Sequence, residues 1–229
     1  MKRVIILDFD DTITDNRQLD FMAFRNPCKK LNLNYPNKIE LLKFRKKGML
    51  AHEIFLLKNN HHKNKLSEFL KLRKIFLNSN ESIKNFKLKK NLLDFLEFIK
   101  KKKIKLFLCT ANSNPKIVKQ FLEYHNIENY FSDLYFLDRL NFSIPNTTKT
   151  NRILIKSSLL HKILIDLNVK TSSIVFIGNS IEDFNASLVD NIPFIYFKNI
   201  YQINEIPNLK TKTNNFEQLV QIIDKDLKK

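Results

Sequence analysis

The sequence predicts an α/β protein with a Rossmann-like, doubly wound core and a small helical cap domain. Three observations carry this prediction. Short apolar runs alternate with amphipathic segments, as in a parallel sheet covered by helices on both faces. Polar residues directly follow several of these runs, and an open α/β sheet binds ligands at that end of its strands. Residues 15–90 have helical periodicity but no convincing strand.

The first apolar run covers residues 4–7 and predicts a short strand that is buried on both faces. Asp8, Asp10 and Asp11 follow at its carboxyl end. Three carboxylates so close together repel one another, and a divalent cation would relieve that repulsion, because hard cations prefer oxygen ligands. The alternative is an acidic turn that caps the next helix. The cluster favours a functional site, because perturbed carboxylates gather at such sites.

The order Asp8-Phe9-Asp10-Asp11-Thr12 resembles Asp-x-Asp-x-Thr, the first motif of the haloacid dehalogenase superfamily of phosphotransferases. The resemblance implies that Asp8 attacks phosphorus and forms an aspartyl-phosphate. Asp10 would point the same way along the extended chain and serve as general acid and then general base. An acid at this position favours phosphoryl transfer, since dehalogenase relatives lack one there.

The cap is expected over residues 15–90, so that residues 1–14 and 91–229 form the catalytic core. In the superfamily such a helical cap lies between the first two core strands and closes over the site. Helical spacing of apolar residues predicts cap helices over 39–44, 51–58, 66–77 and 83–88. Pro27, Pro36 and Gly48 are expected to separate them.

The second and third motifs are expected in the following part of the core. A helix over 91–103 leads to a strand over 104–109, and Thr110 stands at its end. The resemblance implies that Thr110, with Ala111 and Asn112, binds the phosphate. A strand over 134–137, a polar loop over 138–151 and a helix over 152–167 follow. The resemblance implies that Lys156, twelve residues before Asn168, neutralises the nucleophile and the phosphoryl oxygens. Asn168 takes the place of a glycine in the family pattern, and Lys149 is the rival of Lys156.

The fourth motif follows a predicted strand over 173–177. Residues 178–183, Gly-Asn-Ser-Ile-Glu-Asp, resemble Gly-Asp-x-x-x-Asp, and one of only 2 glycines in the chain begins them. Asn179 stands where the family has Asp, so it offers a carbonyl oxygen but no charge. The resemblance implies Mg²⁺ held by Asp8, the Asp10 main-chain carbonyl, and Asn179 or Asp183. A helix over 184–190, a strand over 193–197 and a helix over 216–227 complete the core.

The composition limits the partners. The net charge is +17, but it comes mostly from lysines spread along the chain. This distribution favours AT-rich coding of the gene as the origin of the charge, rather than a nucleic-acid-binding surface. No apolar run reaches the roughly 18 residues that span a membrane. The 2 cysteines form no CxxC pair, and no signal peptide precedes the first strand, so a cytoplasmic protein is expected.

The predicted function is that of an Mg²⁺-dependent phosphatase acting on a small phosphorylated metabolite. A sugar phosphomutase with the same cap type is an alternative. A catalytically weakened relative that binds a phosphorylated ligand or a partner is another, and Asn179 is its only support. The sequence names neither the substrate nor the oligomeric state.

Overall fold

The computed structural model describes residues 4–140, 148–198, 209 and 211–227, and divides them into two compact units. Described residues within 1–14, 88–199 and 206–229 form the core unit, and those within 15–87 form the helical unit. The short strands β2 (Thr14–Asp15) and β3 (Lys87–Leu88) pair where the chain passes between the units. No helix in the described ranges is long and apolar enough to cross a membrane.

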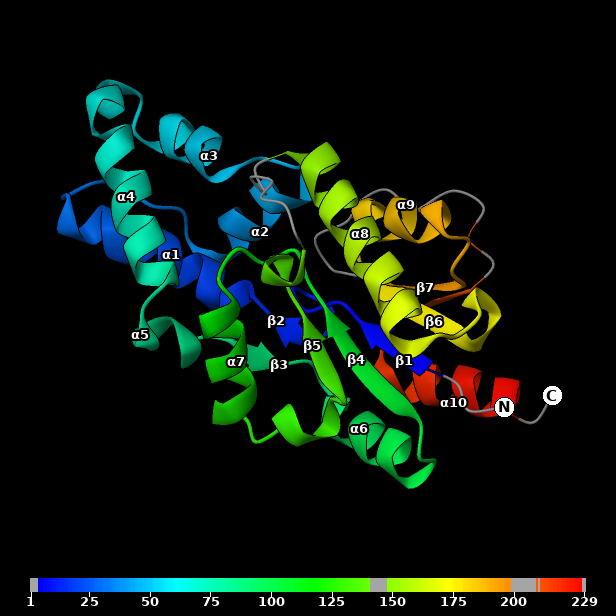
Figure 1. Ribbon diagram of the computed structural model, residues 1–229. Coiled ribbons are helices and arrows are strands. Elements are labelled where there is room, and N and C mark those ends of the chain that lie inside the picture. Colours follow the sequence, from blue (N-terminus) through cyan, green and yellow to red (C-terminus); the bar gives the residue numbers. More distant parts are fainter. Residues whose placement is uncertain (1–3, 141–147, 199–208, 210, 228–229) are drawn as a thin grey trace. The chain divides into compact units, whose positions relative to one another are not determined.

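The core unit is built on a parallel sheet with the strand order β5-β4-β1-β6-β7-β8 (Figure 1). The strands are β1 (Val4–Leu7), β4 (Lys105–Cys109), β5 (Asp133–Tyr135), β6 (Ile174–Gly178), β7 (Phe194–Phe197) and β8 (Lys212–Thr213). From β1 the chain builds outward to β4 and β5 on one side, and then to β6, β7 and β8 on the other. This confirms the doubly wound α/β prediction and places the topological switch point at β1.

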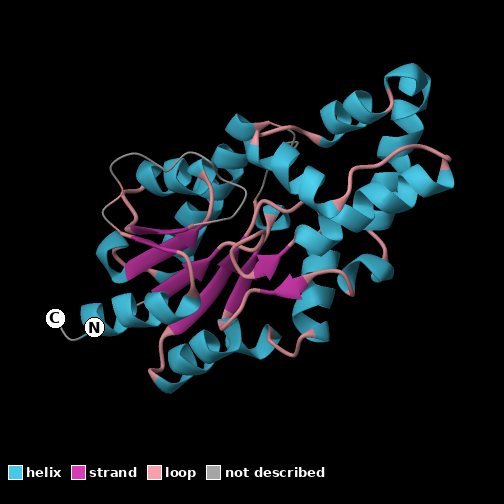
Figure 2. Cartoon of the chain, turned by 180° about the vertical axis from the view of Figure 1, so that it is seen from behind, coloured by secondary structure: helices cyan, strands magenta, loops and turns pink. Residues whose placement is uncertain are grey.

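Helices cover both faces of this sheet, as Figures 1 and 2 show. Helices α8 (Lys149–Leu167) and α9 (Ile181–Val189) lie on one face. Helices α6 (Leu92–Lys101), α7 (Pro115–Tyr124) and α10 (Phe216–Leu227) lie on the other. There the rings of Phe95 in α6 and Phe216 in α10 pack at a tilt, with their centroids 5.0 Å apart.

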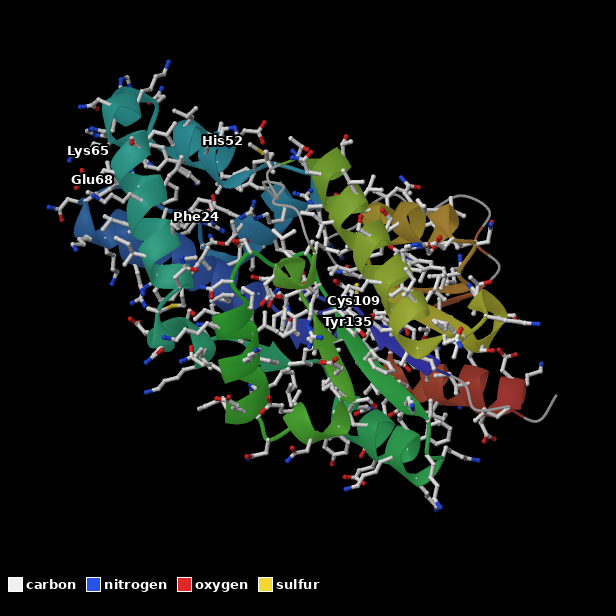
Figure 3. All side chains as sticks on the ribbon, viewed as in Figure 1. Phe24, His52, Lys65, Glu68, Cys109 and Tyr135 are labelled. Carbon is white, nitrogen blue, oxygen red and sulfur yellow. The ribbon has the colours of Figure 1, made fainter. Side chains whose placement is uncertain are left out.

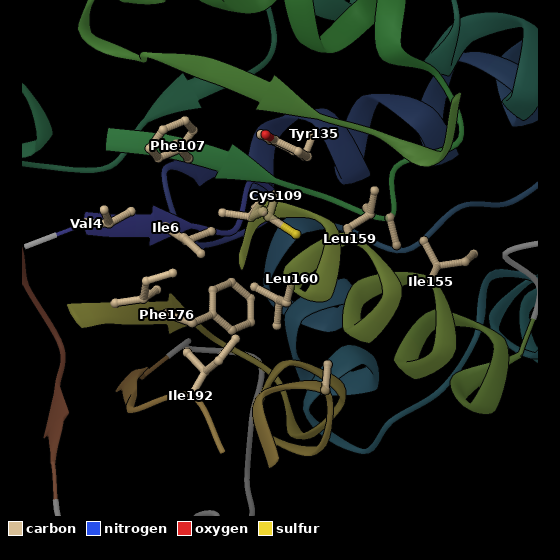
Figure 4. Close-up of a cluster of buried hydrophobic side chains, with 14 residues drawn as sticks. Val4, Ile6, Phe107, Cys109, Tyr135, Ile155, Leu159, Leu160, Phe176 and Ile192 are labelled. Atoms are coloured by element: carbon tan, nitrogen blue, oxygen red, sulfur yellow. The ribbon is translucent and has the colours of Figure 1, made fainter. Parts of the chain in front are cut away.

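Strand periodicity explains how both faces are filled. In β1, Val4 and Ile6 face α8 and pack in one cluster with Phe107, Phe176 and Leu160 (Figure 4). The intervening residues of each strand point to the opposite face. All four residues of β1 are buried, as the apolar run predicts for a central parallel strand. Burying each such side chain contributes roughly 1.5–3 kcal/mol, which holds the strand ends in place.

Capping residues set where the core helices begin. The Thr148 side chain accepts a hydrogen bond from Asn151 N, so α8 begins at Lys149 rather than at the expected residue 152. The expected polar loop is therefore shorter, and its residues 141–147 lie outside the described part. The third strand ends at Tyr135, two residues earlier than expected, because the chain enters a 3₁₀ turn at Leu137.

Asparagine replaces glycine at helix ends in this chain of only 2 glycines. Asparagines with positive φ follow four of the described helices, at Asn32, Asn126, Asn168 and Asn191. Asparagine tolerates this conformation better than most other residues. Asn168, with φ of 47°, ends α8 where the family pattern has a glycine.

The helical unit has its own apolar core. Its helices are α1 (Arg17–Lys30), α2 (Lys38–Lys46), α3 (Ala51–Lys58), α4 (Leu66–Leu77) and α5 (Asn80–Ile83). Phe24 from α1, labelled in Figure 3, lies with its ring centroid 5.4 Å from that of Phe69 in α4. The Phe69 ring also stacks on Phe55 of α3 at 4.6 Å.

Three expectations for this region were wrong. The helix expected over 83–88 is instead the end of α5 followed by strand β3, so a strand does occur within 15–90. Helix α1 was not predicted at all, and Pro27 lies inside it rather than between helices. Tertiary packing of Phe24 and Cys28 outweighs the hydrogen bond that proline removes from a helix.

Candidate active site

The candidate site lies at the carboxyl end of the three central strands. Asp8 follows β1, Thr110 follows β4, and Asn179 follows β6. The register aligns Leu7 of β1 with Leu108 of β4 and with Ile177 of β6, so the residues that follow reach the same edge of the sheet. Sheet pairing thus brings together motifs that lie far apart in the sequence.

Asp8 is the most constrained carboxylate of this edge. Its side chain is 2% exposed, Oδ1 accepts from Lys156 Nζ at 2.7 Å, and Oδ2 accepts from Thr12 Oγ1 at 3.2 Å. Burial, and next the nearby Asp183 carboxylate, raise the pKa of Asp8 to about 8, although Lys156 acts to lower it. The Asp8 carboxylate is therefore held by hydrogen bonds and needs more positive charge to stay ionised.

Lys156 is the cation that the structure places in the site. It lies two turns into α8, and its buried ammonium donates to both Asp8 and Asp183. Burial alone would lower the pKa of Lys156, but the two carboxylates outweigh it and raise the pKa above its usual range. Its rival Lys149 is exposed at the first residue of α8.

Asp183 organises the loop between β6 and α9. Its Oδ2 accepts from Asn179 N at 3.1 Å, from Ser180 N at 3.0 Å and from Ser180 Oγ at 2.7 Å. Ser180 returns the contact as the N-cap of α9, because its Oγ accepts from Asp183 N. Gly178 makes room for this arrangement, since a Cβ there would lie 2.6 Å from Asp183 Cγ.

Asn179 is nearly buried, at 7% exposure, at the end of β6. Within the described part of the chain its side chain makes no hydrogen bond, so its amide oxygen is available to a ligand. No group of three or more His, Cys, Asp or Glu side chains in the described ranges is arranged to hold a metal ion. A metal at this edge would therefore also need neutral oxygen ligands.

The second-motif residues contact one another and the first motif. Thr110 is buried, and its Oγ1 accepts from Asn112 N at 3.1 Å. The Asn112 side chain donates from Nδ2 to Asp10 Oδ2 at 3.0 Å and accepts on Oδ1 from Asn114 N at 2.9 Å. Ala111 is buried between these residues in the chain. All the sequence-predicted site residues thus follow the ends of neighbouring strands or, like Lys156, reach that edge from α8.

Two contributors were not assigned a role from the sequence. Ser180 orients Asp183, and the pattern Ser-x-x-Asp of a capping box was a usable signal for it. Arg152 donates to Glu182 at 2.9 Å, one turn of α8 before Lys156 and one residue of α9 before Asp183. No sequence signal marks that ion pair, because its partners are 30 residues apart.

The comparisons with known proteins agree with this geometry. A family model described as haloacid dehalogenase-like hydrolase matches residues 5–197. No curated protein matches the chain. A solved structure of a haloacid dehalogenase superfamily hydrolase, subfamily IA, from Geobacter sulfurreducens superposes with a TM-score of 0.72 at 14% identity, covering 96% of both chains.

Two further solved structures share the fold. A predicted phosphoglycolate phosphatase from Haemophilus somnus has a TM-score of 0.72 at 17% identity, covering 96% of this chain and 97% of its own. CbbY from Rhodobacter sphaeroides, in complex with xylulose-(1,5)bisphosphate, has a TM-score of 0.63 at 15% identity and 96% coverage of both chains. With the family model spanning β1 to β7, the chain belongs to the haloacid dehalogenase-like hydrolases.

Proposed function

We propose that this hydrolase is a phosphatase that cleaves a small phosphorylated metabolite through an aspartyl-phosphate on Asp8. The observation that carries the proposal is the setting of Asp8, which lies buried at the end of β1 between Lys156 and Thr12. A structural carboxylate needs no second acid beside it, yet Asp10 follows two residues later. This pairing suits a nucleophile and an acid that act on one substrate.

The reaction would proceed in two half-reactions. In the first, an Asp8 oxygen bonds to phosphorus as the bond to the ester oxygen breaks, and Asp10 gives its proton to that leaving oxygen. In the second, water attacks the phosphorus of the aspartyl-phosphate, Asp10 takes a proton from that water, and the Asp8 carboxylate leaves. Lys156 and the Thr110 hydroxyl would stabilise the phosphoryl oxygens during both transfers.

Mg²⁺ fits the donor set of this site. The Asp8 and Asp183 carboxylates contact the ammonium of Lys156, and the Asp10 carboxylate lies close enough to Asp8 to raise its pKa, so hard oxygen atoms dominate the described part of the site. Mg²⁺ is commonly bound by one or two carboxylates, with waters and substrate phosphate completing its ligands. The Asp8 carboxylate, the Asp10 main-chain carbonyl and Asn179 would hold it. When bound, it would supply positive charge that keeps Asp8 ionised and balances the phosphoryl group.

The hydrogen bonds favour Asn179 over Asp183 as the direct metal ligand. Both Asp183 oxygens are engaged, one by three donors of the loop and the other by Lys156. Asn179 offers an uncommitted amide oxygen but no charge, so we expect weak Mg²⁺ binding. The presence of Asn179 in place of the family's aspartate also supports a second candidate function. In that case the protein is a weakened relative that binds a phosphorylated ligand without rapid turnover.

The test is phosphate release from a panel of phosphorylated metabolites, with and without Mg²⁺. Sugar phosphates come first, because CbbY was solved with a sugar bisphosphate. Turnover of at least one compound that requires Mg²⁺ is expected. Tight binding of a panel member without release would favour the weakened relative, and isomerisation without release would favour a phosphomutase. If no compound of the panel is hydrolysed and none is bound, the proposal is rejected.

The positive charge of the chain supports an anionic substrate without requiring a nucleic acid. The net charge of +17 attracts phosphorylated compounds at long range. Binding to random-sequence DNA at rising salt tests the alternative, since a protein that binds the phosphate backbone shows a steep loss of affinity. We expect no tight DNA binding at physiological salt.

A further inference from the structure

We infer that Asn112 is a positioning residue for the proposed acid Asp10, and that it fixes the orientation of the Asp10 carboxyl group. This inference rests on the proposed phosphatase function. It adds to the expectation from the sequence that Asn112 binds the substrate. The juxtaposition that carries it is the 3.0 Å hydrogen bond from Asn112 Nδ2 to Asp10 Oδ2.

The orientation of the Asn112 amide is determined by its other neighbour. Asn114 N lies 2.9 Å from Asn112 Oδ1, and a backbone N–H can only donate. The oxygen of the amide must therefore face Asn114, which turns the NH₂ group toward Asp10. With the opposite orientation, two donors would meet at Asn114, and the amide oxygen would meet the Asp10 carboxylate.

The backbone of Asn112 is fixed as well. Its N–H donates to Thr110 Oγ1 at 3.1 Å, and Thr110 N in turn donates to Tyr135 O at 3.1 Å, at the ends of neighbouring strands. Asn114 then caps α7 by accepting from Ile117 N. Asn112 is thus held by the end of β4 on one side and the start of α7 on the other, so its amide has little freedom to turn away from Asp10.

The consequence concerns the orientation of the Asp10 carboxyl group. The Asn112 amide holds Oδ2, so the group cannot rotate without losing that hydrogen bond. Asn112 would in this way keep Asp10 in one orientation toward the leaving group, which takes a proton from Asp10 and departs as an alcohol or phenol while phosphorus bonds to Asp8.

The test compares two esters of nearly the same shape, phenyl phosphate and para-nitrophenyl phosphate. Nitrophenolate leaves without help, whereas phenolate needs a proton from the acid. General acid catalysis contributes on the order of 10²–10⁴-fold. In Asn112→Leu we expect kcat/KM for phenyl phosphate to fall roughly hundredfold. For para-nitrophenyl phosphate we expect a much smaller loss. A residue that only binds the phosphate, or only supports the fold, would lower both values by the same factor.

A second variant and a double-mutant cycle with Asp10→Asn complete the test. Asn112→Ala keeps the N–H to Thr110 and removes the donor to Asp10 without adding charge or bulk, so it should fold even if Asn112→Leu does not. It should show the same selective loss. In the Asp10→Asn background, Asn112→Leu should cost little more, because residues that act together are not additive.

Equal losses for both esters, or full additivity with Asp10→Asn, would overturn the positioning role while leaving the phosphatase assignment intact. A wild-type chain that releases phosphate from neither ester nor from any panel compound would instead overturn the proposed function, and this inference with it.

Discussion

The core unit and the helical unit each bury an aspartate beside cations, but the balance of charge is opposite. In the core unit, Asp8 and Asp183 share the single cation Lys156. In the helical unit, the single carboxylate of Asp20 is shared by Arg45, at 2.7 Å, and Arg73, at 3.1 Å.

The pKa values follow from this balance. Burial acts to raise the pKa of Asp20, but its hydrogen bonds and charge interactions with Arg45 and Arg73 outweigh burial and lower it. In the core unit, burial and then Asp183 raise the pKa of Asp8. A group stabilised in its charged form is suited to hold a fold together, whereas one short of positive charge is suited to receive a cation.

The two clusters also differ in what surrounds them. Both guanidinium groups lie over the Phe24 ring, at 5.6 and 5.8 Å from its centroid, and Arg45 also donates to Met49 O at 2.9 Å. Asp20 therefore joins α1 to α2 and α4 within the helical unit. The cluster around Asp8 instead sits at the ends of the strands β1 and β6.

The largest effect is expected from replacing the nucleophile. Asp8→Asn should lower kcat by a factor on the order of 10⁴–10⁶, as other losses of a nucleophile do. Its melting temperature should not fall, because one of two carboxylates that repel each other is removed. Phosphate release and thermal unfolding measure the two effects. Substantial turnover by a pure Asp8→Asn sample would exclude the covalent mechanism.

Asp20→Asn should show the reverse pattern. Removing the carboxylate leaves two partly buried guanidinium groups facing each other, and breaking such a pair costs about 3 kcal/mol. Urea unfolding would show this loss while kcat at 25 °C stays near the wild-type value. Asp133→Asn is the matched control, because Asp133 pairs with Arg139 at the surface and such pairs contribute about 0.5 kcal/mol. Equal losses in the two variants would mean that Asp20 has no special role.

A smaller effect is expected at Asn179. Asn179→Asp should tighten Mg²⁺ about tenfold, because a charged ligand exceeds a neutral one by roughly 1–2 kcal/mol and ~1.4 kcal/mol is tenfold. The half-saturating Mg²⁺ concentration for phosphate release measures it. If Asn179→Asp leaves that concentration unchanged while Asp183→Asn raises it severely, Asp183 is the direct ligand instead.

The smallest effect is expected in the pH dependence of the stability that Asp20 contributes. The pKa of Asp20 is lowered on folding, so its contribution to stability is present above the unfolded value of about 4 and is lost as pH falls through the folded pKa. Below about pH 4 the difference in urea stability between wild type and Asp20→Asn should therefore narrow by about 1 kcal/mol. A difference that stays constant from pH 6 to pH 3 would contradict the lowered pKa.

Much of the core could be predicted from the sequence because its signals are local. The run 4–7, Gly178 and the polar residues that follow the central strands mark these strands and what lies at their ends. Helix α10 (Phe216–Leu227) was predicted with its observed bounds from its amphipathic spacing alone. The fold class follows, because alternating strands and helices leave few other arrangements.

What could not be predicted depends on contacts between distant residues. In the sequence only the spacing to Asn168 favours Lys156 over Lys149, and the packing of α8 against the sheet is what turns Lys156 inward. Strand β8 is a two-residue pairing with β7 and has no periodicity to detect. Helix α1 contains a proline, and its helical state depends on the buried Phe24 and Cys28 rather than on local propensity.

The central position of β1 has a consequence for the order in which the protein folds during synthesis. Val4 pairs with Lys105 on one side and with Ile174 on the other, so β1 waits for partners made about a hundred and about 170 residues later. The residues 15–87 of the helical unit are contiguous and need no such wait. Contacts this distant in sequence are slow to form. Asp8 is thus synthesised well before the strands that complete its native surroundings.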